Sequence, residues 1–133
     1  MGEYREKKAF KGRVREARVT LTATELQALG AGTTYAKQFG SIPPDAIITH
    51  TLLKRGVAFT DGDVGTFAAT VGDGTTADNV MPAGDIDGGT TPVLTAQDAL
   101  ISAGGTFTLN VSSSVNLNTA TAGSCEVIVR FIA

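Results

Sequence analysis

Short apolar runs, each ended by residues that favour turns, constrain the fold of this chain more than any other sequence feature. The runs at 46–54, 57–60, 66–71, 107–111 and 125–131 are rich in β-branched, aromatic and other apolar residues. Clusters of Gly, Asp, Asn, Ser or Pro separate them. Alternation of apolar and polar residues is typical of a half-buried strand, whereas an amphipathic helix repeats every three to four residues. The chain is therefore predicted to be rich in short strands.

Other segments complete this prediction. Strands at 19–22 and 35–39 raise the expected total to about seven or eight, and Arg55-Gly56 predicts a bend or bulge between two runs. The stretch 40–45, with Pro43 and Pro44, cannot lie in a central ladder, and 61–65 has turn chemistry.

Two segments instead contain residues at the spacing of a helix N-terminal capping box. Either Thr22 with Glu25 or Thr24 with Gln27 has the three-residue spacing of a capping box, and Thr95 precedes Asp98 by the same interval. A hydroxyl group at this distance before Glu, Asp or Gln can cap a helix. Short helices are therefore predicted within 22–30 and 95–101. The stretch 72–91 is predicted to be one long loop that packs through its large apolar residues, which are Val80, Met81 and Ile86.

The expected fold class is all-β: a β-sandwich, jelly-roll-like, with one or two short helices in its connections. The 133 residues suffice for one hydrophobic core. We expect residues 1–16 to form a basic, extended N-terminal arm and residues 17–133 to form the sandwich domain.

The charge of the chain is unevenly distributed. The net charge is −2, but residues 1–18 hold seven basic and three acidic residues, a local charge of +4 that leaves −6 elsewhere. Such an arm can bind nucleic acid, a membrane surface or an acidic protein face. Only Tyr4 and Phe10 accompany it, so the stacking typical of nucleic-acid binders is poorly supplied. We predict that the arm binds protein through Lys7, Lys8, Lys11, Arg13 and Arg15.

The sequence offers little for catalysis or metal binding. His50 is the only histidine and has no local catalytic partner, so a structural or surface role is expected. Asp61 and Asp63, like Asp85 and Asp87, resemble the start of a calcium loop, but Gly65 and Gly72 occupy ligand positions after the first pair. We expect turns here, with no metal and no cofactor.

The remaining chemical features also favour a structural protein. Cys125, the only cysteine, has the phase of Val127 and Val129, which predicts burial as a small apolar side chain. No apolar run reaches the length of about 20 residues that a membrane span needs, and the first residues lack the apolar segment of a signal peptide. Neither a membrane location nor secretion is expected.

Residues 19–29, Val-Thr-Leu-Thr-Ala-Thr-Glu-Leu-Gln-Ala-Leu, resemble the opening of small virion structural proteins of tailed phages. In those proteins a VTLT-x-x-E-L-x-x-L phrase precedes a β-sandwich body. The apolar run after Pro43-Pro44 and the closing run 127–131 are similar to that group too. The resemblance covers about residues 17–133 and identifies no functional residue.

This resemblance implies a non-enzymatic capsid decoration (cement) protein that binds the major capsid protein or other virion subunits and stabilises the shell. It implies a homo-oligomer, with a trimer favoured, on the capsid surface of a virion assembled in the host cytoplasm. The alternatives are a tail, head-fibre or baseplate component, or a carbohydrate-binding sandwich. Because the chain has no Trp, a carbohydrate-binding sandwich would have a poor aromatic platform on which to stack sugars. An enzyme ranks last.

Overall fold

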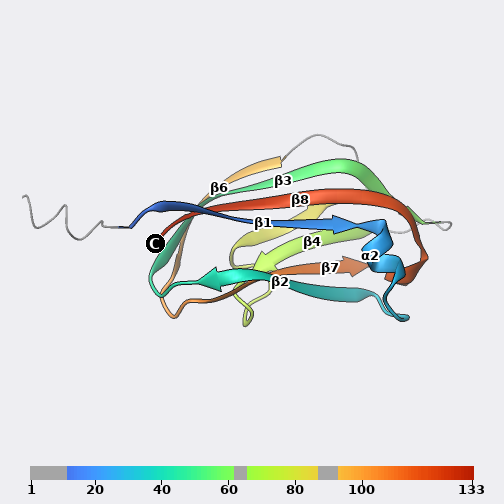
Figure 1. Cartoon of the computed structure of the whole chain (residues 1–133), viewed down its shortest axis with the longest axis horizontal. Helices are drawn as coiled ribbons and strands as arrows, with labels where there is room; N and C mark the ends of the chain where they lie inside the picture. Colours follow the sequence, from blue (N-terminus) through green and yellow to red (C-terminus); the bar gives the residue numbers. More distant parts are fainter. Residues whose placement is uncertain (1–11, 62–65, 87–92) are drawn as a thin grey trace, which may run out of the picture.

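The computed structural model describes residues 12–61, 66–86 and 93–133 and arranges them as two antiparallel sheets of four strands each (Figure 1). Sheet A has the order β1-β8-β3-β6, and sheet B has the order β2-β7-β4-β5. The strands are β1 (Val14–Thr22), β2 (Thr34–Ile42), β3 (Ala46–Asp61), β4 (Phe67–Gly72), β5 (Met81–Asp85), β6 (Val93–Ile101), β7 (Gly105–Ser113) and β8 (Ala120–Ile132). This architecture confirms the predicted all-β sandwich.

The pairing of the strands follows a nested pattern. β1 pairs with β8, β2 with β7, β3 with β6 and β4 with β5, all antiparallel. The chain is thus one long hairpin of eight strands that folds over on itself. Successive strand pairs along the hairpin lie alternately in sheet A and sheet B. β1 and β6 form the edges of sheet A, and β2 and β5 form the edges of sheet B.

The core lies between the two sheets and is built from the alternation read in the sequence. In β8, Cys125, Val127, Val129 and Phe131 are buried, while the residues between them are more exposed. Phe107 of β7 packs against Phe131 of β8 with ring centroids 5.1 Å apart, and it stacks on Phe39 of β2 at 5.5 Å. These ring contacts join sheet B to sheet A.

The first predicted helix is confirmed. α2 (Ala23–Gln27) begins after Thr22, whose Oγ1 accepts a hydrogen bond from the Glu25 backbone N–H at 3.3 Å. Leu26 is fully buried on the sandwich. The Glu25 carboxylate in turn accepts hydrogen bonds from Tyr35 Oη at 2.8 Å and from Lys37 Nζ at 2.9 Å, which tie α2 to β2.

The second predicted helix is wrong, because residues 95–101 belong to strand β6. The capping spacing of Thr95 and Asp98 is a local signal only. In the folded chain the backbone of β6 pairs with β3, and a ladder against an existing strand satisfies groups that one turn of helix would leave unpaired.

The predicted long loop at 72–91 is also interrupted, since it contains β5. Its three predicted anchors are nevertheless buried: Val80 and Ile86 are inaccessible, and Met81 is 4% exposed. β5 pairs with β4, which the isolated sequence could not indicate. Residues 87–91 lie outside the described ranges.

Several predicted boundaries move. β2 continues through Gly40 to Ile42, which is compatible with its place at a sheet edge. The predicted bulge is present, because the register of β3 against β8 shifts between Arg55 and Val57. Residues 62–65 of the predicted turn lie outside the described ranges. The polar region before β8 contains a short 3-10 helix, η1 (Leu117–Thr119).

Candidate interaction surface

The outer faces of the two sheets differ in chemistry. Among the described residues, the large apolar side chains that remain exposed all belong to strands of sheet A: Val14 (67%), Val57 (52%), Val93 (43%), Leu94 (67%) and Leu100 (60%). The outward positions of sheet B carry small or uncharged polar residues, such as Thr34, Gln38, Thr70, Asn110 and Ser112. Sheet A therefore presents the face that water solvates poorly.

The apolar side chains of sheet A form rows across its strands. Cross-strand partners in a sheet project from the same face. One row joins Val14, Ile132, Ile47 and Leu100 on the four successive strands β1, β8, β3 and β6. A second row joins Arg18, Ile128, Leu52 and Leu94 in the same order.

Charged groups lie between these two rows and at the β1 end of the second row, and they are paired with one another. Glu16 accepts hydrogen bonds from Arg18 Nη2 at 3.0 Å and from Arg130 Nη2 at 3.2 Å. These bonds to the two guanidinium groups lower the pKa of the Glu16 carboxyl group. The three residues border a depression of about 380 Å³, which His50, Leu52, Leu94 and Ile128 complete.

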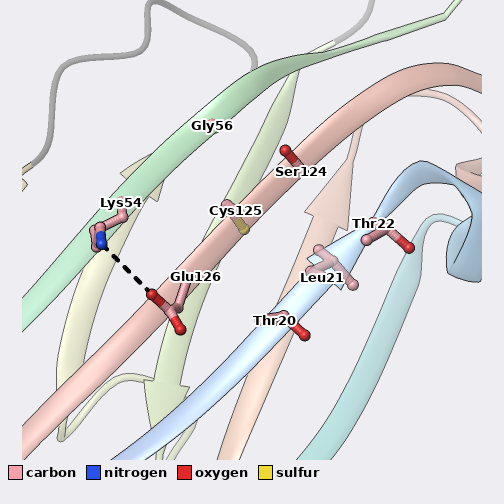
Figure 2. A pocket seen from close by; sticks show the side chains of 8 residues that line it. All are labelled: Thr20, Leu21, Thr22, Lys54, Gly56, Ser124, Cys125 and Glu126. Carbon is pink, nitrogen blue, oxygen red and sulfur yellow. Dashed lines mark ion pairs between the residues drawn. The ribbon is translucent and has the colours of Figure 1, made fainter.

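A second depression of about 490 Å³ lies farther along the same face (Figure 2). Its lining residues come from three adjacent strands: Thr20, Leu21 and Thr22 from β1, Ser124, Cys125 and Glu126 from β8, and Lys54 and Gly56 from β3. Lys54 Nζ and Glu126 Oε1 form an ion pair of 3.7 Å across it.

The β3 bulge shapes this second depression. The Val57 backbone N–H donates to Ser124 Oγ at 3.1 Å, and a Cβ atom on Gly56 would lie 2.7 Å from that oxygen. A glycine, a serine and two threonines thus keep the space open. Both depressions can receive protruding side chains of a partner.

The predicted basic residues divide into two groups. Arg13 and Arg15 are exposed at the start of sheet A, where the Arg13 N–H donates to the Ala133 carbonyl at 2.8 Å. Lys7, Lys8 and Lys11 lie outside the described residues. β1 begins at Val14, so the last residues of the expected arm already pair with β8.

Sequence reasoning missed the exposed leucines of β6. Leu100 falls within the predicted helix 95–101 and Leu94 directly before it, so the sequence prediction gives neither as an exposed strand residue. The apolar pairs at the two ends of the segment, Val93-Leu94 and Leu100-Ile101, were the available signal of an exposed strand.

The two residues whose side chains are most often reactive, His50 and Cys125, have structural positions in this fold. His50 is exposed on the outer face of sheet A, as expected for a surface histidine. Cys125 is buried, and burial, with a smaller effect of the Glu25 charge, raises the pKa of its thiol to about 12. The predicted burial of this cysteine is confirmed, and its thiol stays protonated at neutral pH.

Over residues 12–61, 66–86 and 93–133, no group of three or more His, Cys, Asp or Glu residues is placed to hold a metal ion. Asp63 and Asp87 fall in the gaps between these ranges. The helices within the same ranges are too short or too polar to span a bilayer.

Comparison with known proteins places the fold in context. No known family and no curated protein sequence matches this chain. Among solved structures, a chain of the cyanophage Pam1 capsid asymmetric unit is similar with a TM-score of 0.65. The match covers 92% of this chain and 86% of that chain at 21% sequence identity. At this identity the similarity shows a shared fold.

Proposed function

We propose that this chain is a non-enzymatic structural protein of a phage virion that decorates the capsid, binds the major capsid protein or neighbouring virion subunits, and stabilises the shell. The shared fold with a chain of a phage capsid supports a virion role. The nested strand orders support a jelly roll, since a folded eight-stranded hairpin produces these two sheets.

The observation that carries the binding role is the outer face of sheet A. One apolar row crosses all four strands and a second crosses β8, β3 and β6, and soluble monomers rarely expose apolar area of this kind unless it is functional. These charged groups of the face are already paired with one another, because Glu16 bonds Arg18 and Arg130 and Lys54 pairs with Glu126. Docking therefore buries apolar surface, and the ion pairs at its margin contribute specificity.

The basic residues extend this surface. We propose that the basic N-terminal segment clamps acidic faces of shell subunits through Lys7, Lys8, Lys11, Arg13 and Arg15. On a shell with many identical sites, a homo-oligomer such as a trimer adds weak contacts by avidity. The location is then the capsid surface of a virion assembled in the host cytoplasm.

Shell melting tests the proposal. A ligand that binds only the assembled shell stabilises it by mass action, so saturating protein should raise the temperature at which bare shells rupture, measured by light scattering. Ile128→Gln, in the centre of the sheet A face, should reduce this increase. Thr70→Gln is the matched control, since Thr70 is a half-buried outward residue of sheet B. An unchanged rupture temperature, or equal loss in both folded variants, contradicts the proposal.

Salt dependence tests the arm separately. Exposed charges act through a screened field, so replacing Lys7, Lys8 and Lys11 with Ala should weaken shell binding and flatten its dependence on ionic strength. If the triple variant binds shells as tightly as wild type at low salt, the arm does not contribute to binding.

The same measurements distinguish the alternatives. A tail, head-fibre or baseplate protein would bind those assemblies and leave shell melting unchanged. For carbohydrate binding, the sheet B depression of about 440 Å³ offers hydroxyl and amide groups, but its one aromatic residue, Tyr35, is half-buried and donates its hydroxyl to Glu25. A specific hit on a glycan array would favour that alternative.

A further inference from the structure

β1 and β2 form one side of the sandwich, where an edge of sheet A lies beside an edge of sheet B. Within the described ranges β1 pairs with β8 alone, and β2 pairs with β7 alone. An exposed strand edge presents unpaired backbone N–H and C=O groups, which can pair with a strand of another chain. This side of the molecule therefore has two neighbouring positions at which a strand could be added.

The register of β1 against β8 determines which backbone groups of β1 face its free edge. Arg13 and Ala133 exchange both of their backbone hydrogen bonds, at 2.8 and 3.1 Å, so they form a hydrogen-bonded pair. In an antiparallel ladder such pairs alternate with pairs whose N–H and C=O groups point away from the partner strand. The register continues through β1 without a shift. The N–H and C=O groups of Glu16, Arg18 and Thr20 therefore point away from β8, toward the free edge.

Lys37 reaches from β2 to this edge. Exposed and half-buried residues alternate in β2, and Lys37 has the phase of Tyr35 and Phe39, which pack against the core. Its Nζ donates a hydrogen bond to the Thr20 carbonyl at 2.8 Å. Because that carbonyl faces the free edge of β1, the ammonium group occupies the place where the N–H of an added strand would bind. For β2 itself, an inward-pointing charge is a further obstacle to strand addition.

The Glu25 carboxylate holds Lys37 in this position. Its Oε1 accepts a hydrogen bond from Lys37 Nζ at 2.9 Å, and its Oε2 accepts one from Tyr35 Oη at 2.8 Å. The Lys37 and Glu25 side chains are 30% and 27% exposed, so water screens this ion pair less than it screens a pair on the open surface. We call these four residues, Thr20, Glu25, Tyr35 and Lys37, the Lys37 latch. The latch joins β1, α2 and β2.

We propose that the Lys37 latch closes the β1–β2 side of the sandwich against strand addition, so that neither sheet continues into another chain there. A chain rich in strands that also exposes apolar side chains on sheet A is prone to edge-to-edge aggregation, and the latch reduces this tendency. Any homo-oligomer then forms through other surfaces. The inference does not depend on capsid binding, and its test uses no shells.

Lys37→Met tests the latch, because it removes the ammonium group and keeps a long apolar side chain. A hydrogen bond to a charged group contributes a net factor of about 10 to 100, so self-association beyond the wild-type state should strengthen by roughly that factor in analytical ultracentrifugation. Lys37→Arg keeps the cation and should behave as wild type does. Lys54→Met is the matched control, since Lys54 also forms an ion pair, with Glu126, but lies on the inner strand β3.

Two further measurements separate edge pairing from loss of folding. Thermal melting verifies that each variant is folded at the assay temperature. Lys37→Met combined with Glu25→Gln leaves no unpaired carboxylate and should associate as the single variant does, so it carries the same test if the single variant unfolds.

Quenched hydrogen exchange locates the contact. In the associated Lys37→Met protein, exchange should slow at the outward amides of Glu16 and Arg18. Three results would each overturn the proposal: folded Lys37→Met and double variants that associate no more than wild type, association of Lys37→Arg or Lys54→Met equal to that of Lys37→Met, or unchanged exchange at these two amides.

Discussion

Replacing Gly123 in β8 with Ala should strongly destabilise the sandwich. Gly123 has φ of +150°, a conformation that residues with a Cβ rarely adopt. A Cβ at this position would lie 2.8 Å from Phe59 Cε1 and closer still to Cγ and Cδ1. Phe59 is 1% exposed and packs against Phe67 with ring centroids 5.9 Å apart, so it has little room to withdraw.

The magnitude follows from two costs. Carbon atoms in contact normally stand about 3.5–4.0 Å apart, so the ring must retreat by roughly 1–2 Å into a packed core. Overpacking of this kind costs about 1–3 kcal/mol, and backbone strain at positive φ adds about 1–3 kcal/mol. We expect a loss of about 3–5 kcal/mol in the free energy of unfolding, a decrease in Tm on the order of 10–20 °C for a chain of this size.

Thermal unfolding followed by circular dichroism, with urea titration for the free energy, measures this loss. Gly30→Ala is the matched control, because a Cβ there meets nothing within 4 Å and no positive φ applies. That variant should unfold within about 1 kcal/mol of wild type. If Gly123→Ala melts as wild type does, the close approach of β8 to Phe59 is wrong.

Four further outcomes are expected. Phe107→Ala should cost about 3–5 kcal/mol in urea titration, since its ring packs on Phe39 and Phe131; a smaller loss would mean that the core collapses around the site. Cys125 should resist iodoacetamide at pH 8 in the native protein and react in urea, because its thiol is buried with a pKa of about 12. Hydrogen bonds from the Thr76 and Thr75 backbone lower the pKa of Asp73, so its contribution to stability is present above the unfolded pKa and is lost as pH falls from about 4 through the lower folded value. Asp73→Asn should therefore flatten the acid dependence of Tm, and an equal slope in both proteins would refute this assignment. Deleting residues 1–11 should leave Tm unchanged, whereas deleting 1–16 should lower it, because Val14, Arg15 and Glu16 pair with β8.

Local patterns in the sequence predicted the parts of the fold that local physics controls. Alternation in 107–111 and 125–131 identified both the strands and their buried sides, because side chains of a strand point alternately to opposite faces. The capping spacing of Thr22 and Glu25 identified α2 for a similar reason, since the bond between them spans three residues. The burial of Cys125 followed from its phase in β8.

Tertiary pairing decided the rest. The same capping spacing at Thr95 failed because β3 offered the segment a partner strand, and no local signal reports the presence of a distant partner strand. The candidate surface depends even more on pairing: Val14, Ile47, Leu100 and Ile132 come from four separate parts of the chain. Each of these residues taken alone is an ordinary apolar residue in a strand. Their continuity as one row is set by the register of three strand pairs, and that register exists only once the sheet has formed.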